Sequence, residues 1–225
     1  KTMTVQEYLT QAKESLQSGE TEQNLSDAKE NYEKALEMEN DNPEAYLGIA
    51  DVYIRENDYD GAKEVLEDGM ETTGDISISQ KIREMESGSI FDSDGKIRIR
   101  RGYDEEGNLK WYHKVFYRED KKEKGTGLYT PDGEEMAYVK AVYNAEGQFI
   151  EGAGYSGEDG SLDIGKMTYD ENGNCVTVSQ YTLDGEWKQT TSYVYDEEGH
   201  MIEEHYEDPS GGKSMAKYDL DENGN

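Results

Sequence analysis

Oxygen-bearing side chains alternate near the end of the chain, in the stretch DLDENGN. Asp219, Asp221 and Asn223, with Gly224 after them, match the first half of an EF-hand calcium loop. The bidentate glutamate that completes such a loop would fall beyond Asn225. Because the same residues also fit a turn pattern that recurs along the chain, the sequence predicts a turn here and no metal site.

The residue types that enzymes use are present, but their spacing favours no reaction. His113, His200 and His205 are too scattered for a zinc ligand set, and GYSG at 154–157 lacks the spacing of a nucleophile elbow. Glycoside hydrolysis requires two carboxylates, yet 52 acidic residues make chance pairs inevitable. The single cysteine, Cys175, excludes an intrachain disulfide and is expected to be a buried packing residue. We therefore predict that the protein is not an enzyme, has no catalytic residues and needs no cofactor.

Aromatic rings are the remaining candidate chemistry, because sugar rings stack on aromatic faces. The chain has 18 tyrosines, and most recur at regular intervals. Regular spacing is typical of cross-strand pairs, each worth roughly 0.2–1 kcal/mol, so a binding ring should break the regularity. Tyr112, which alternation places on the face opposite Leu109 and Trp111, is the first candidate for a glycan contact, and Tyr138 is the second.

Net charge limits the partners. The 225 residues include 52 Asp and Glu against 23 Lys and Arg, which gives a net charge of -29. Such a surface repels phosphate groups, so we expect neither nucleic acid nor an anionic membrane as a partner, whereas calcium, cationic peptides and neutral glycans stay open. No apolar run approaches the roughly 20 residues of a membrane helix. A removed leader or a lipid anchor before Lys1 stays open, as does the oligomeric state.

The first third of the chain has the periodicity of amphipathic helices and contains an internal repeat. Small and large residues recur 34 positions apart, as Ala28 and Ala62, Tyr32 and Leu66, and Ala35 and Gly69. We expect helices over about 5–18, 24–38, 43–56 and 59–70. A fifth helix, in SISQKIREME with Ser77 as its N-cap, would cover the last exposed face of the repeats.

The segment NPEAYLGIADVYIRENDYDGAKEVLEDG resembles a tetratricopeptide repeat, although Gly69 replaces the family's usual alanine. Its packing positions match that family at Tyr46, Ile49, Ala50, Tyr53, Ala62 and Leu66. The resemblance implies a helical domain over 1–88, in which the first helix of each repeat lines a peptide-binding groove. That groove would present Leu9, Lys13, Leu16, Gln17, Leu47, Asp51, Ile54 and Arg55. The alternative is that this strip packs against the neighbouring domain.

The remaining residues, 89–225, follow a period of 26. Turn signatures that begin with Asp, Thr or Asn and place Gly fourth separate stretches of alternating residues, such as KIRIR and NCVTV. An aromatic residue leads each turn, at steps of 12 and 14 positions: Phe91, Tyr103, Tyr117, Tyr129, Tyr143, Tyr155, Tyr169, Tyr181 and Tyr195. This pattern predicts an all-β domain of antiparallel hairpins in a meander or solenoid, so the fold class is α+β with two domains.

The clusters YDEEGN, YDENGN and YDEEGH resemble the YD repeats of Rhs-type surface and toxin proteins. That resemblance implies a bacterial protein that is extracellular or at the cell surface. Together with the helical groove, it leads us to expect a non-catalytic binding or scaffold protein whose partner is a protein or peptide. The alternatives are a carbohydrate- or cell-wall-binding module that uses sheet aromatics, and a structural spacer without a ligand.

Overall fold

The computed structural model describes residues 3–156 and 160–218. The possible calcium ligands at 219–224 therefore lie outside the described residues. The chain divides into two compact units, residues 1–123 and 124–225. The change from helices to strands falls earlier, between Glu86 and Ile90. The first unit extends beyond it because the first strands pack on the helices.

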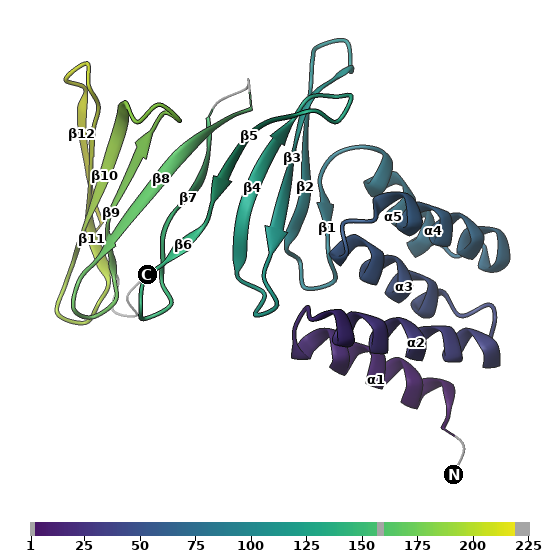
Figure 1. Ribbon diagram of the computed structural model, residues 1–225. Helices are drawn as coiled ribbons and strands as arrows, with labels where there is room; N and C mark the ends of the chain where they lie inside the picture. The colour runs from purple at the N-terminus through teal and green to yellow at the C-terminus, as the bar shows by residue number, and fades with distance from the viewer. Residues whose placement is uncertain (1–2, 157–159, 219–225) are drawn as a thin grey trace. The chain divides into compact units, whose positions relative to one another are not determined.

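Helices occupy the first part of the first unit, where each packs against the next along the chain (Figure 1). They are α1 (Val5–Ser18), α2 (Glu22–Met38), α3 (Pro43–Arg55), α4 (Tyr59–Thr73) and α5 (Ile76–Glu86). Their bounds agree with the helices that the repeat pattern predicts. None of the described helices combines the length and the apolar character that a bilayer span requires.

Polar side chains fix where these helices begin. Thr4 and Glu7 form a capping box at α1, in which each side chain accepts a hydrogen bond from the other residue's backbone N–H. The N-cap of α5 is Asp75, not Ser77 as predicted. The Asp75 carboxylate accepts the Ser77 N–H at 2.8 Å, and it is the better acceptor because it is charged.

Two hydrophobic clusters hold the first unit together. The first joins α1, α2 and α3 through residues that include Leu9, Leu16, Ala28, Tyr32 and Ile49. The second joins α3, α4 and α5 to the first two strands through Ala50, Ile54, Leu66, Ile78, Ile90 and Ile99. Helices α3, α4 and α5 therefore share a core with the first two strands.

Two glycines let tyrosine rings lie directly on a neighbouring helix. A Cβ atom added at Gly48 would come within 2.3 Å of the Tyr32 ring, and one added at Gly69 would come within 2.6 Å of Tyr46. Gly69 therefore replaces the alanine of the tetratricopeptide pattern because the Tyr46 ring occupies the space of the methyl group.

The described strands form two antiparallel sheets in which the order of the strands follows the sequence (Figure 1). One contains β1 (Ile90–Phe91), β2 (Ile97–Tyr103), β3 (Leu109–Tyr117), β4 (Glu123–Tyr129) and β5 (Glu135–Lys140). The other contains β6 (Val142–Tyr143), β7 (Phe149–Ser156), β8 (Ser161–Tyr169), β9 (Cys175–Tyr181), β10 (Trp187–Tyr195), β11 (Met201–Glu207) and β12 (Lys213–Lys217). The predicted α+β class with an antiparallel meander is confirmed.

The aspartate that begins each Asp-led turn stabilises the turn by accepting hydrogen bonds from its later residues. Asp170 accepts the N–H of Asn174 on its carboxylate at 2.8 Å and the N–H of Gly173 on its backbone carbonyl at 3.1 Å. Gly173 has a φ of 88°, in the left-handed region where only glycine is unstrained. The same two bonds recur in the turns that begin at Asp104, Asp196 and Asp208.

The tyrosine period reflects the way in which the hairpins close. The register shifts by one residue where the turn-leading aromatic pairs with the next strand, as at Tyr103 with Leu109 and Tyr169 with Cys175. Three of these tyrosines also donate their hydroxyl to the carbonyl at the start of the preceding strand. These bonds are Tyr117 to Ile97 at 3.0 Å, Tyr169 to Phe149 at 2.6 Å and Tyr195 to Cys175 at 2.8 Å.

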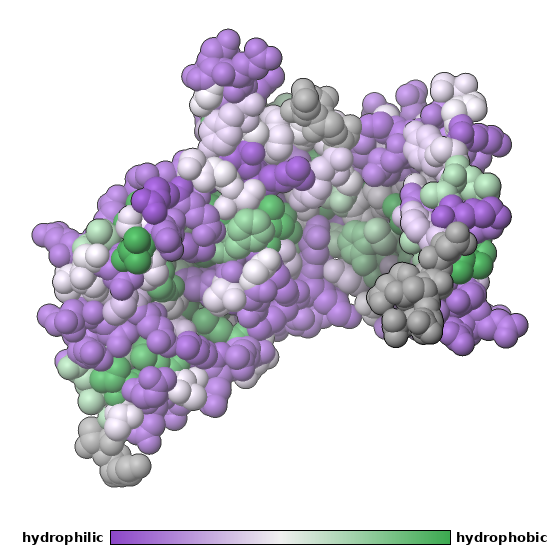
Figure 2. All heavy atoms as spheres, turned by 180° about the vertical axis from the view of Figure 1, so that it is seen from behind, coloured by the Kyte–Doolittle hydropathy of each residue, from purple (hydrophilic) through white to green (hydrophobic). Residues whose placement is uncertain are grey.

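Many strands of the second unit are half-buried on both faces. Every residue of β9 has this intermediate exposure. Cys175, which the sequence predicts to be buried, is one of them, although partial burial still raises the pKa of its thiol. The surface in Figure 2 is accordingly mostly hydrophilic, with separate hydrophobic patches.

Candidate functional site

Arg55, the last residue of α3, lies at the centre of a charge network in the first unit. Its Nε donates to Asp51 Oδ2 at 2.8 Å, and its Nη2 donates to the Ser93 hydroxyl at 3.0 Å. Its Nη1 lies 3.2 Å from both Glu20 Oε1 and Asp94 Oδ2. The Arg55 side chain is fully buried, so these contacts replace the water that a charged group otherwise requires.

A second arginine extends the network to β2. Arg98 Nη2 lies 2.5 Å from Glu20 Oε1 and 2.7 Å from Asp92 Oδ2. Lys121 adds a contact of 2.9 Å to Asp94. Because Glu20 contacts both arginines, the network joins the α1–α2 loop, α3, the β1–β2 turn and β2.

Neighbouring charges favour the charged forms of Arg55, Arg98 and Asp94. Burial by itself lowers the pKa of Arg55 and of Arg98, but the neighbouring carboxylates outweigh burial and raise both pKa values. Burial raises the pKa of Asp94, whereas Lys121 and Arg55 lower it, and the net pKa shift is downward. The network therefore binds the β1–β2 turn to the helices electrostatically.

The network occupies the second repeat's share of the predicted groove. Ser93 donates its backbone N–H and its hydroxyl to the two Asp51 carboxylate oxygens, each at 2.7 Å. The other predicted groove residues lie in different environments. Leu9, Leu16 and Ile54 are buried in the hydrophobic clusters, Leu47 is half-buried, and Lys13 and Gln17 are exposed.

An open hollow lies beside the first repeat. It has a volume of about 220 Å³ and is lined by Lys13, Leu16, Gln17, Tyr32, Ser93 and Asp94. Lys13 Nζ also contacts Glu44 Oε1 at 2.6 Å. Three of the predicted groove residues therefore share one hollow with the tip of the β1–β2 turn.

The sequence does not reveal the partners of Arg55. The turn DSDG, which contains Asp92, Ser93 and Asp94, matches the hairpin pattern, so its carboxylates resemble ordinary turn residues. The one available signal is that two acidic residues directly precede the basic strand KIRIR. Nothing in that stretch indicates contact with a helix some 40 residues earlier.

Tyr112 lines a second hollow of the first unit, with a volume of about 350 Å³. Leu109 lines the same hollow, so the prediction that these two residues lie on opposite faces is wrong. The register shift between Gly102 and Tyr103 explains the error, because a bulge breaks strict alternation. Tyr138, the other candidate, lies in β5 and is 42% exposed.

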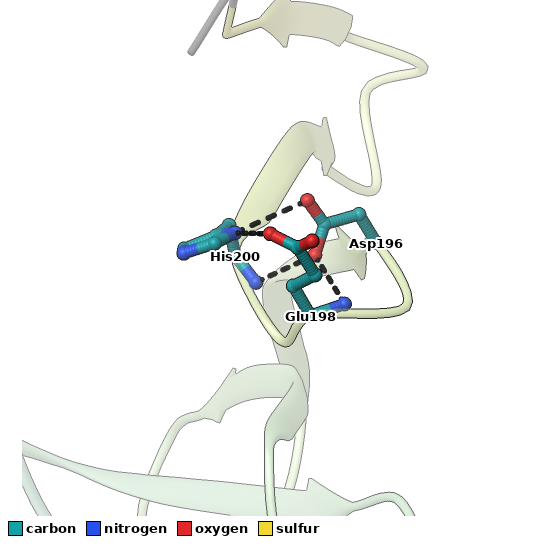
Figure 3. A group of neighbouring side chains, drawn as sticks. All are labelled: Asp196, Glu198 and His200. Carbon is teal, nitrogen blue, oxygen red and sulfur yellow. Dashed lines mark hydrogen bonds and ion pairs between the residues drawn. The ribbon is translucent and has the colours of Figure 1, made fainter. Parts of the chain in front are cut away.

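Asp196, Glu198 and His200 bring three possible metal-ligating atoms within 4.8 Å of one another (Figure 3). Turn geometry accounts for this cluster. His200 and Glu198 donate their backbone N–H groups to Asp196 Oδ1, each at 2.9 Å, and His200 Nδ1 lies 3.2 Å from Asp196 Oδ2. Asn174 makes the corresponding side-chain contact with Asp170 at 3.0 Å, so we assign no metal to this turn.

A family model of the tetratricopeptide repeat matches residues 21–79. This range contains α2, α3 and α4 and the first residues of α5. The N-terminal helices are therefore tetratricopeptide-like repeats, which indicate a protein-interaction scaffold. No curated protein matches the chain.

Several solved structures resemble parts of the chain. The pore form of the Photorhabdus luminescens Tc holotoxin, in a mutant version, shares 13% identity over 58% of this chain and 9% of its own, with a TM-score of 0.35. The complex of TcdB2, TccC3 and Cdc42 shares 12% identity over 55% of this chain and 10% of its own, with a TM-score of 0.18. The GtfA/B complex bound to UDP and GlcNAc shares 13% identity over 53% of this chain and 22% of its own, with a TM-score of 0.20.

This chain thus spans about a tenth of the two toxin chains and about a fifth of the GtfA/B chain. All three TM-scores are below 0.5, so the similarities do not establish a shared fold with these proteins.

Proposed function

We propose that the protein is a non-catalytic scaffold that binds a protein or peptide segment through the open hollow of its helical repeats. The observation that carries this proposal is the match to the tetratricopeptide repeat, together with a hollow lined by Lys13, Leu16 and Gln17. In this repeat family such positions face the groove that holds a peptide. The part of the groove beside Arg55 is not available, because the β1–β2 turn binds there.

Charge selects the partner. With a net charge of -29, the chain attracts basic segments and repels acidic ones at long range. A hollow of about 220 Å³ accommodates one or two side chains. The partner is therefore a basic segment that inserts a side chain between Gln17 and the turn.

The proposed location is the surface of a bacterial cell or the medium around it. The support is the resemblance of YDEEGN, YDENGN and YDEEGH to repeats of exported proteins. Immunodetection on intact cells of the source bacterium, with and without external protease, tests this location. Protein that is recovered only from the soluble interior would contradict it.

Binding is tested by affinity capture from envelope extracts with variants of the hollow. Gln17→Trp fills the hollow with a bulky ring, and Lys13→Glu places a second carboxylate beside Glu44. Gln17→Trp should reduce capture of the partner at least tenfold, whereas Lys13→Glu adds negative charge beside the hollow and should increase capture of a basic segment. Lys63→Glu on α4 is the matched control, because Lys63 is partly exposed and does not line the hollow. Equal capture by the wild type and both hollow variants would refute the proposed site.

A further inference from the structure

The hollow beside Tyr112 combines the features of a small-ligand site. Its wall comes from three separate segments of the first unit, which are the start of α4 with the corner before it, strand β2 and strand β3. The volume of about 350 Å³ falls within the range of small-molecule sites, roughly 300–1,000 Å³. The lining includes Tyr59, Asp60, Arg101, Leu109, Tyr112 and Lys114.

Strand register places the sheet residues of this hollow on one face. Arg101 is directly opposite Tyr112, and Ile99 is directly opposite Lys114. Residues in such pairs, two positions apart along each strand, point to the same side of the sheet. Ile99 is buried in the cluster that joins the strands to the helices, so this face turns towards the helices.

Two tyrosine rings and one ammonium group lie close together in the lining of the hollow. Lys114 Nζ lies 5.9 Å from the centroid of the Tyr59 ring and 5.8 Å from that of the Tyr112 ring, at cation–π distance from both. The Tyr59 hydroxyl donates to Asn57 Oδ1 at 3.3 Å, which helps to orient its ring. An aromatic face in such a position can stack against the C–H face of a pyranose ring.

The charges that line the hollow balance. Arg101 and Lys114 carry two positive charges, and Asp58 and Asp60 carry two negative charges. An anionic ligand would also meet the repulsion of a chain with net charge -29. A cationic ligand would lie beside the ammonium of Lys114. A neutral ligand avoids both costs, and one that carries hydroxyl groups accepts from the cations and donates to the carboxylates.

Two of the polar groups are held in place. Arg101 donates one N–H to the Gly88 carbonyl at 3.1 Å, and a guanidinium carries five such donors. Asp58 accepts the N–H of Gly61 at 2.9 Å as the N-cap of α4. Held groups lose less conformational entropy when a ligand binds.

We propose that this hollow binds a neutral saccharide unit, a hexose or an N-acetylhexosamine. Its ring stacks on Tyr112, and its hydroxyls exchange hydrogen bonds with Asp60, Arg101 and Lys114. This site is independent of the protein partner proposed above, because the two hollows share no lining residue.

The test is a titration of the purified full chain with a panel of neutral mono- and disaccharides of hexoses and N-acetylhexosamines. Isothermal titration and saturation-transfer NMR measure binding up to roughly 10 mM sugar, within the range of weak affinities. We expect at least one panel member to bind. We expect Tyr112→Ala to weaken that binding at least tenfold. Tyr155→Ala, which removes an exposed tyrosine of β7 outside the hollow, should leave it unchanged.

A second variant separates loss of binding from loss of folding, since Tyr112 packs against the hydrophobic cluster. Asp60→Ala changes an exposed side chain in the first turn of α4 and should weaken binding three- to tenfold while the melting temperature stays the same. Gln17→Trp should not affect the sugar. Absence of binding across the panel, or binding that both hollow variants retain, would overturn the proposal. Tighter binding of a glucuronic acid disaccharide than of any neutral sugar would overturn the assigned ligand class.

Discussion

Replacement of Arg55 by methionine should destabilise the first unit by about 3–5 kcal/mol, the usual cost of removing one partner from a buried ion pair. Methionine preserves a long apolar side chain, so packing changes little. Four hydrogen bonds and one positive charge are lost, while the carboxylates of Asp51, Glu20 and Asp94 remain. Summing four charge-assisted bonds at about 1.5–3 kcal/mol each would give a larger figure. That sum overstates the loss, because Glu20 keeps Arg98 and Asp94 keeps Lys121.

Urea unfolding monitored by tryptophan fluorescence measures this change. Trp111 lies in the first unit and Trp187 in the second, so a Trp187→Phe background makes the signal report on the first unit. With a slope of about 1.5–2 kcal/mol per molar urea, the midpoint should fall by roughly 2 M. Arg55→Lys keeps the charge but not the planar fork of donors, so its midpoint should lie between those of the wild type and Arg55→Met.

Arg83→Met is the matched control, since Arg83 is exposed on α5 of the same unit. Its midpoint should shift by less than about 0.5 M, as expected for surface substitutions. If Arg55→Met unfolds within that same margin, the network does not hold the turn to the helices.

Three further predictions concern the repeats themselves. Gly48→Ala should cost about 1–3 kcal/mol in urea unfolding because its Cβ would collide with the Tyr32 ring, whereas Gly165→Ala, where nothing lies closer than 3.8 Å, should be far milder. Tyr169→Phe should lower the stability of the second unit by about 0.5–1.5 kcal/mol, because it removes the 2.6 Å hydrogen bond to the Phe149 carbonyl. If its effect is no larger than that of Tyr181→Phe, the hydroxyl bond does not stabilise the hairpin. Hydrogen bonds within the turn, first from the Asn174 side chain, lower the pKa of Asp170 below its ordinary value of 3.8. A lowered pKa in the folded state gives stability that is present above pH 3.8 and is lost as the pH falls through the folded value. Asp170→Asn should therefore make the melting temperature fall less steeply between about pH 5 and pH 2 than it does in the wild type.

The fold was predictable because its signals are local. A turn that begins at Asp170 and places Gly173 fourth requires only five consecutive residues, and the 26-residue period repeats such signals. The helices are likewise defined by packing positions within each repeat. No characteristic residue type marks the bulge that moves Leu109 to the face of Tyr112. Simple alternation therefore predicted the wrong face for Leu109 relative to Tyr112.

The candidate sites were less predictable because their contacts join distant segments. Arg55 meets Glu20 and Asp94, which lie 35 and 39 residues away, and no pattern in a single sequence pairs them. Repeat positions in the sequence predict Lys13 and Gln17 as groove residues, and the spacing of the aromatic residues distinguishes Tyr112. No sequence signal shows that Tyr59 and Lys114 accompany Tyr112, because the α3–α4 corner and β3 meet only in the folded chain.

The size of the open hollow constrains how a partner protein can bind. Stable protein interfaces bury about 800 Å² on each partner, which takes roughly 20–30 residues a side. A hollow of about 220 Å³, lined by six residues, is only a small part of such an interface. A peptide anchored only beside Gln17 would therefore bind weakly, and a tight partner must contact additional surface. The acidic helices and hairpin turns supply such surface, and their charge favours the same basic partner that the hollow selects. If affinity for the partner falls steeply between about 50 and 200 mM salt while Gln17→Trp still abolishes binding, both contributions are present. If salt has no effect, the contact is confined to the hollow and the acidic surface does not take part.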